Sequence, residues 1–85
     1  MLPIRNHYFK AIHEELERAR AKFPGNRFLL AALMEEVGEL SAAILQRQGR
    51  ERRIAEAIQV AVVAIRIAEE GDSSFDDLTD AEAKP

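Results

Sequence analysis

The stretch FLLAALMEEVGELSAAILQ, residues 28–46, is the part of the chain that decides its expected fold. It is apolar and rich in the helix formers Ala and Leu, and its only charges are Glu35, Glu36 and Glu39. At about 100° per residue, the three carboxylates fall within roughly 100° of one another and form one acidic cluster on a helix. No Lys or Arg stands three or four positions from any of them. The cluster therefore needs a cation from elsewhere, and a divalent metal ion is the sharpest candidate.

Turn signals divide the rest of the chain into helical segments. Apolar residues recur at helical spacing before the breaker Pro24-Gly25-Asn26, and a short turn around Gly49 follows the acidic stretch. We predict an all-α fold with three main helices over residues 4–23, 27–47 and 51–70, followed by a short C-terminal turn. Asn26 is the expected N-cap of the second helix, and Gly49 and Gly71 are the expected C-caps of the second and third.

The chain is expected to form one helical domain over residues 1–78, with a disordered acidic tail over residues 79–85. The third segment carries IAEAIQVAVVAIRIA, residues 54–68, which is apolar nearly all round. A helix of this kind must be covered on most of its sides. Because three helices of one 85-residue chain cannot provide that cover, we expect an oligomeric helical bundle, either a homodimer or a homotetramer.

Composition and charge narrow the functional classes. Cys is absent, so a disulfide or a thiolate metal site is excluded. The longest uncharged run, Ala57 to Ile65, is too short to cross a membrane, and without a signal pattern a cytoplasmic protein is expected. Residues 1–66 hold eleven Lys and Arg against eight Asp and Glu, whereas residues 67–85 hold one against seven. The acidic end argues against a nucleic-acid partner.

A second polar pair, Glu56 and Gln59, lies on one face of the third helix. A three-residue turn favours antiparallel packing of the second and third helices, which brings Glu36 and Glu39 toward this pair. Mg²⁺ takes about six oxygen ligands, several from water and phosphate. Carboxylates that point inward from facing helices are a common way to build such a site.

The two acidic groups also resemble the signature of a known family. E35-E36-V-G-E39, followed seventeen residues later by E56-A-I-Q59, is similar to the EExxE…ExxD pattern of the MazG-like nucleotide pyrophosphohydrolases. That family belongs to the all-α NTP pyrophosphatase superfamily. The resemblance covers residues 27 to 72, including LMEEVGEL and AIRIAEEGD.

The resemblance implies a Mg²⁺-dependent (or Mn²⁺-dependent) house-cleaning hydrolase that splits a nucleoside triphosphate into monophosphate and pyrophosphate. It makes Glu36, Glu39 and Glu56 metal ligands, together with position 59. Glu35 would bind metal or position and deprotonate the attacking water. Phe28 falls on the acidic side of its helix and is a candidate wall for the substrate, and the loop-proximal Arg52 and Arg53 are candidates for binding the triphosphate.

Alternatives remain for several of these residues. Gln59 stands where the family has Asp, and its amide is either a weak ligand or a buried group that a neighbour satisfies. Arg52, four residues before Glu56, is a competing partner for that acid, and Arg66 is expected to pair with Glu69 or Glu70. The alternative function is a non-catalytic helical module for oligomerisation or nucleotide sensing that retains the acidic metal patch.

Overall fold

The computed structural model describes residues 3–78. Its elements are the helices α1 (Pro3–Lys22), α2 (Leu29–Leu45) and α3 (Arg50–Glu70) and the short 3-10 helix η1 (Ser73–Leu78). Within these residues there is no strand. The all-α class and the three main helices are therefore confirmed, and every observed bound lies within two residues of the expected one. The predicted disorder of the tail, residues 79–85, lies outside the described residues.

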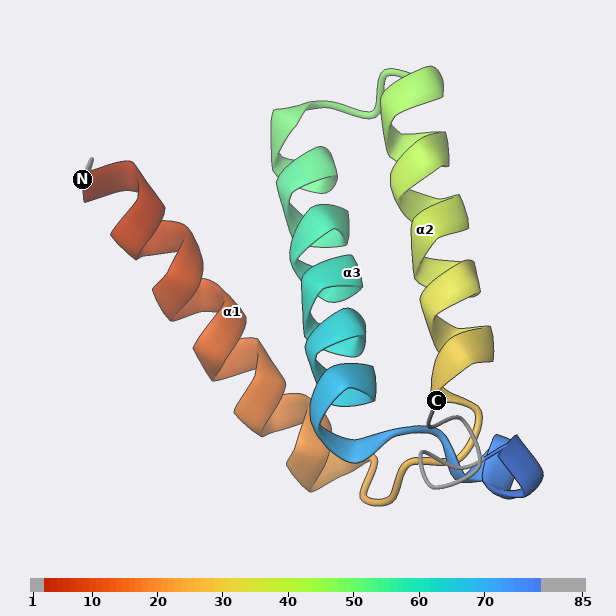
Figure 1. Ribbon diagram of the computed structural model, residues 1–85. Coiled ribbons are helices and arrows are strands. Elements are labelled where there is room, and N and C mark those ends of the chain that lie inside the picture. Colours follow the sequence, from red (N-terminus) through yellow and green to blue (C-terminus); the bar gives the residue numbers. More distant parts are fainter. Residues whose placement is uncertain (1–2, 79–85) are drawn as a thin grey trace, which may run out of the picture.

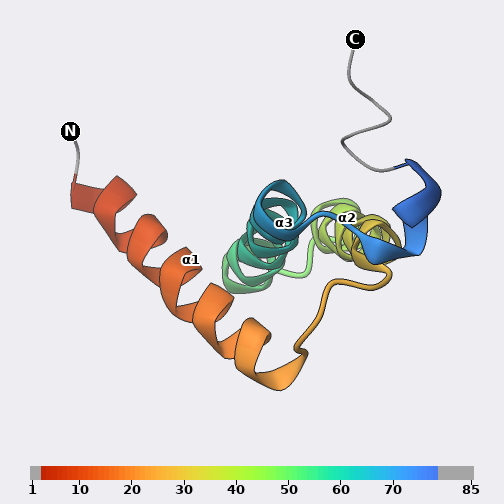
Figure 2. The same cartoon turned by 60° about the horizontal axis from the view of Figure 1, so that its bottom comes forward.

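Helix α3 lies between the other two helices (Figures 1 and 2). α2 and α3 run antiparallel and side by side, joined by the short turn at the top of Figure 1. α1 packs against α3 near its own C-terminal half, and its N-terminal half leans away from the pair. The radius of gyration is 14.7 Å, against about 12 Å for a compact chain of this length. The arrangement is therefore open on the side where α1 diverges.

The core is small because only a few apolar side chains are shielded on all sides. Leu16 of α1, Leu29 and Ala43 of α2 and Val62 of α3 are buried. Many large apolar side chains remain more than a third exposed in the single chain, namely Phe9, Phe23, Phe28, Leu30, Met34, Val37, Ile44, Leu45 and Phe75. Among the described residues, no helix is both long and apolar enough to cross a membrane.

The predicted N-cap of the second helix is wrong. α2 begins after Phe28, whose backbone is left-handed (φ 63°) and whose side chain makes no capping hydrogen bond. Asn26 instead donates from Nδ2 to the backbone carbonyl oxygen of Glu70, at 2.6 Å. This bond joins the α1–α2 loop to the end of α3, so the Asn side chain serves a tertiary contact rather than a local one.

Asp72 provides the cap that Asn26 does not. Its carboxylate accepts hydrogen bonds from the backbone N–H groups of Phe28 (3.1 Å) and Leu30 (2.7 Å), which are free at the start of α2. A third backbone donor, Ser74, lies at 2.9 Å. These bonds, led by that from Leu30, hold the pKa of Asp72 below its ordinary value. The segment after α3 therefore closes the N-terminus of α2.

The end of α2 also differs from expectation. The left-handed residue is Arg47 (φ 52°), and the N–H of Gln48 donates to the carbonyl of Ala43 at 3.0 Å, as in a Schellman ending. Gly49, with φ 106°, stands instead at the N-cap of α3. Gly71 is confirmed as the C-cap of α3, with φ 71°.

The short C-terminal turn is confirmed as η1. The sequence also suggests that Phe75 and Leu78 pack back on the helices. Phe75 is 44% exposed, and the side chain of Leu78 lies outside the described residues.

Candidate metal centre and adjoining cavity

Three carboxylates from two helices converge in the middle of the α2–α3 pair. One oxygen from each of Glu36, Glu39 and Glu56 lies within 4.8 Å of the others. The convergence follows from the antiparallel packing, because the middle of α2 faces the first half of α3. Glu36 is half-buried, Glu39 is exposed and Glu56 is buried. The expected proximity of the two acidic groups is thus observed, whereas the role of these residues as ligands stays a prediction.

Glu36 lies where a negative charge is unfavourable. Its Oε1 is buried without a hydrogen-bond partner among the described residues. Burial, followed by the negative charges of Glu39, Glu56 and Glu35, raises the pKa of Glu36 above its ordinary value. A buried acceptor left unpaired costs free energy, and a cation bound between the carboxylates would remove this cost.

The spacing suits a small divalent ion. Two oxygens on opposite sides of Mg²⁺ lie about 4.1 Å apart, because each Mg–O distance is about 2.0–2.1 Å. The oxygens of the three acids lie within 4.8 Å of one another, which is close to that separation. The donor set of three carboxylates is also one that hard cations prefer.

Glu56 has a cation already. Arg52, one turn earlier on α3, places Nη2 at 2.8 Å from Glu56 Oε2. The Glu56 side chain is 7% exposed and that of Arg52 is 56% exposed, so the guanidinium covers the carboxylate from the solvent side. The competing interpretation of Glu56 from the sequence, an ion pair with Arg52, is therefore confirmed. A metal ion at Glu56 would share this carboxylate with Arg52 or displace it.

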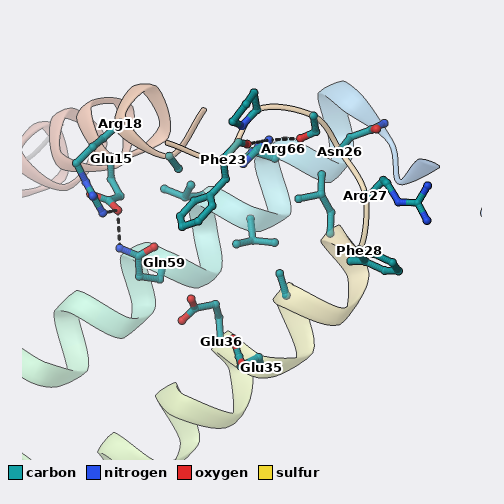
Figure 3. A pocket seen from close by; sticks show the side chains of 17 residues that line it. Glu15, Arg18, Phe23, Asn26, Arg27, Phe28, Glu35, Glu36, Gln59 and Arg66 are labelled. Carbon is teal, nitrogen blue, oxygen red and sulfur yellow. Dashed lines mark hydrogen bonds and ion pairs between the residues drawn. The ribbon is translucent and has the colours of Figure 1, made fainter. Parts of the chain in front are cut away.

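Gln59 does not point at the three acids in this structure. Its Nε2 donates to Oε2 of Glu15 on α1, at 2.7 Å, and Figure 3 shows its amide nitrogen turned toward α1 while Glu36 reaches from α2 toward α3. The second interpretation, a buried amide satisfied by a neighbouring carboxylate, describes this contact. Glu15 also pairs with Arg18, which is the largest cause of its lowered pKa.

Glu15 is a member of the site that the sequence did not predict, because it stands among the other charged residues of the first helix. The Glu15 side chain is only 17% exposed. A signal was present in the spacing: Glu15 stands three residues after Ile12 and four before Ala19, two members of the apolar stripe that faces α3. A charged residue at that register lies at the margin of the buried face.

A cavity of about 560 Å³ adjoins the acidic group. It lies between the C-terminal half of α1, the first half of α2 and the second half of α3, and Glu36 belongs both to its wall and to the metal candidate. Glu35, Gln59 and Glu15 also line it (Figure 3). Its volume falls in the range of small-molecule sites. The cavity therefore offers a volume next to the carboxylates that a ligand can enter.

The remaining candidates are separated by the fold. Phe28 lines the rim of the cavity but is 58% exposed, with Arg27 stacked 5.0 Å from its ring centre. Arg52 and Arg53 are not among the residues that line this cavity, and Arg53 lines smaller hollows near the α2–α3 turn. Of the predicted substrate-binding residues, the structure brings only Phe28 to the cavity.

Arg66 pairs with Glu70 at 3.2 Å, as the sequence predicts. It is 4% exposed and also donates to the backbone carbonyls of Phe23 (3.0 Å) and Gly25 (2.5 Å). Through these bonds the guanidinium joins α3 to the loop between α1 and α2. It lies at the end of the cavity away from Glu36 (Figure 3).

Comparisons of this chain with protein-family models, with curated proteins and with solved structures gave no match.

Proposed function

We propose that this protein is a Mg²⁺-dependent nucleoside triphosphate pyrophosphohydrolase of the MazG-like kind, which releases pyrophosphate and a nucleoside monophosphate. The observation that carries the proposal is the convergence of Glu36, Glu39 and Glu56 within 4.8 Å beside a cavity of about 560 Å³. The unpartnered Oε1 of Glu36 supports a bound cation. The cavity supports a ligand of nucleotide size next to that cation.

In this proposal the site residues have three different roles: metal binding, activation of water and contact with the base. Glu36, Glu39 and Glu56 hold Mg²⁺ (or Mn²⁺), and the metal supplies charge neutralisation at the phosphates and a more acidic bound water. Glu35 lines the cavity next to Glu36 and orients and deprotonates the attacking water. Phe28 is the candidate contact for the base.

The polar residues around the three acids could bind substrate or metal only under certain conditions. Arg52 must exchange Glu56 for a phosphate if it is to bind substrate. Arg53 would bind the triphosphate only where that group extends beyond the cavity. Gln59 donates from Nε2 to Glu15 at 2.7 Å, so it would ligate the metal only if its Oε1 turned toward the three acids.

Two contacts favour a second candidate function, a non-catalytic module for oligomerisation or nucleotide sensing. Arg52 provides Glu56 with a cation without any metal, and Gln59 is held by Glu15. A site with one neutral amide in place of a carboxylate binds metal more weakly. Under this alternative the acidic patch and the cavity bind a nucleotide without cleaving it.

Thermal unfolding with and without Mg²⁺ tests the metal. A site formed only in the folded state raises the midpoint when its ligand is added. We expect Mg²⁺ or Mn²⁺ to raise Tm of the natural chain, and Glu36→Gln to remove most of that rise. The matched control is Glu14→Gln, an exposed acid of α1, which should keep the rise. No rise for the natural chain would count against a metal centre.

A pyrophosphate-release assay over a panel of nucleoside triphosphates tests hydrolysis. We expect release by the natural chain with Mg²⁺, and loss of release in Glu35→Gln and Glu36→Gln. Absence of release with every nucleotide, together with retained nucleotide binding, would favour the non-catalytic module. A gain of activity in Gln59→Asp alone would lead to the same interpretation, because it would restore the charge that the family has at this position.

The proposal includes assembly as a homodimer or a homotetramer acting on nucleotides of the cytoplasmic pool. The small core of four buried apolar side chains and the exposed apolar residues of α1 and α2 support assembly.

A further inference from the structure

The outward side of α2 carries an exposed apolar stripe. We call Leu30, Met34, Val37, Ser41 and Ile44 the α2 outer stripe. Ser41 is its polar member, and Ile44, at its edge, also lines a hollow toward α1 and α3. The stripe residues follow one another at alternating intervals of four and three residues, which is the spacing of a helix–helix seam. Leu30 is 44% exposed, Met34 62%, Val37 38% and Ile44 52%. Such a stripe on a helix of a small domain is a surface that another helix covers.

The residues that flank this stripe are also uncharged. On one side lie Ala31, Gly38 and Leu45, the last of which is 80% exposed. The two α2 carboxylates of the candidate metal centre, Glu36 and Glu39, lie roughly 180–240° around the helix from Leu30. The stripe and the acidic group thus occupy different faces of α2. A partner seated on the stripe would leave the acids accessible.

Gly38, which flanks the stripe midway along α2, adds an independent observation. Gly in the interior of a helix destabilises it relative to Ala. Within the chain nothing requires Gly here, because a Cβ at this position would meet no atom within 4 Å. Close approach of a second backbone is the condition that favours Gly at an exposed helical position. The residue stands next to Val37, the midpoint of α2 (Leu29–Leu45).

We propose that the α2 outer stripe is a two-fold interface between two copies of this chain, whose α2 helices cross antiparallel at Val37 and Gly38. A second copy fits because the stripe is self-complementary about this midpoint. With the axis there, Met34 of each copy lies opposite Ser41 of the other, so a long side chain meets a short one. Leu30 of each copy lies opposite Leu45 of the other, so two apolar side chains meet there. Antiparallel helices also bring opposite ends of their dipoles together.

The surface area that a second copy would bury is large enough for a dimer. Covering the exposed apolar stripe, with Leu45, on both copies removes on the order of 1,000 Å² from water, which is near the lower limit for a specific interface. The described part of a single copy buries only four apolar side chains, so the second copy adds substantially to what holds the fold together. The inference concerns assembly alone and stands or falls independently of hydrolysis.

Sedimentation or light scattering from low to high micromolar concentration tests the interface. The natural chain should be a dimer or a larger even assembly. Gly38→Leu should dissociate it, because the new side chain has open space in one copy but occupies the crossing point of two. The matched control is Ala64→Leu, the same kind of enlargement at an exposed position of α3, and it should leave the assembly unchanged. A monomeric natural chain, or dissociation by Ala64→Leu and not by Gly38→Leu, would overturn the proposal.

A cysteine cross-link provides a second test that does not require a stable monomer. The chain has no Cys, so Val37→Cys introduces a single thiol beside the proposed axis. Mild oxidation should convert most of this variant into a covalent dimer that retains its helical circular dichroism. Ala64→Cys should remain uncross-linked under the same conditions. Should Gly38→Leu fail to fold, this result decides: a Val37→Cys variant that cross-links no faster than Ala64→Cys would refute the interface.

Discussion

At the scale of single residues, the acidic group is held together at an electrostatic cost. Glu36 is half-buried beside two other carboxylates, and its pKa is raised chiefly by burial. Glu56, at 6% exposure, is buried more deeply and its nearest cation is Arg52. A buried carboxylate keeps its charge only when a cation or several donors accompany it. Arg52 therefore supplies the positive charge beside this buried carboxylate.

This arrangement predicts opposite effects of Arg52→Gln without and with metal. In metal-free protein the variant should unfold at a lower temperature, with a loss of about 1–2 kcal/mol, because Glu56 loses its ion-pair partner while staying buried. Added Mg²⁺ should raise Tm of this variant more than that of the natural chain, since the ion no longer competes with the guanidinium. Differential scanning fluorimetry over a Mg²⁺ series measures both effects.

Arg53→Gln is the matched control for Arg52→Gln. It removes the same charge one residue away, at a position with no ion pair to the described part of the chain. Its Tm and its response to Mg²⁺ should follow those of the natural chain. An equal Mg²⁺ response of all three proteins would show that Arg52 does not compete for the site.

At the scale of elements, the ends of the helices are joined by contacts distant in sequence. Asp72, after α3, accepts hydrogen bonds from the first N–H groups of α2. Arg66, within α3, holds the carbonyls of Phe23 and Gly25 in the loop between α1 and α2. Both contacts lie at the end of the bundle that carries the α1–α2 loop. They fix the relative positions of the three helices that line the cavity.

Asp72→Ala should lower Tm by several degrees at neutral pH, because the first turn of α2 loses its cap. The pKa of Asp72 is lowered from 3.8 in the folded protein. Its stabilisation is therefore fully present above that ordinary value and is lost as the pH falls through the still lower folded value. The difference in Tm between the two proteins should stay constant near neutrality and shrink in acid, below about pH 4.

Ser73→Ala, in the same turn, is the control for Asp72→Ala, since no side-chain hydrogen bond to α2 is formed there among the described residues. A Tm difference for Asp72→Ala that persisted unchanged at the lowest pH values would contradict the role of the ionised carboxylate.

Arg66→Met should destabilise the protein by about 3 kcal/mol, because Glu70 loses a buried partner and two loop carbonyls lose their donor. The stability of Arg66→Lys should lie between that of the natural chain and that of Arg66→Met. Lys keeps the charge, but its ammonium group lacks the planar fork that reaches several acceptors at once. Urea unfolding followed by circular dichroism measures the loss. Arg50→Met, at an exposed position of α3, is the control. A change below about 1 kcal/mol for Arg66→Met would contradict the structural role.

At the scale of the whole molecule, the chain is open and sparsely packed. Its radius of gyration of 14.7 Å exceeds the roughly 12 Å of a compact domain of equal length. Its core draws one or two side chains from each helix, whereas α2 exposes its outer stripe. These features agree with a chain that completes its apolar packing in an assembly.

Assembly predicts that stability depends on protein concentration. When folding is coupled to association, Tm rises with the total concentration of chains. Tm of the natural chain should therefore increase steadily over a dilution series, and that of Gly38→Leu should not. Circular dichroism melts at several concentrations make the comparison. A Tm of the natural chain independent of concentration would mean that single copies hold the fold alone.

The elements and their order were predictable because they depend on local patterns. Helical periodicity and the breakers Pro24 and Gly25 located the three helices to within two residues. A short turn between two long helices implied antiparallel packing, which is enough to bring Glu36 and Glu39 near Glu56. The proximity of the acids thus followed from spacing along two helices rather than from any long-range contact.

The hydrogen-bond partners were not predictable in the same way. Asn26 has the chemistry of a local N-cap, yet it binds the carbonyl of Glu70 because the end of α3 lies beside it. Gln59 is turned to Glu15, which belongs to a helix whose approach the sequence did not specify. A polar side chain takes whichever partner the packing of the elements brings within reach.

The sequence by itself therefore determined the helices, their order and the acidic group on two of them, because periodicity and turn residues act within a few positions of the chain. Only the tertiary structure decided the polar contacts between elements: Glu15 on Gln59, and Asp72 on the first turn of α2. The physical reason is that ion pairs and hydrogen bonds require contact at about 3 Å. The relative placement of α1, α2 and α3 sets such contacts.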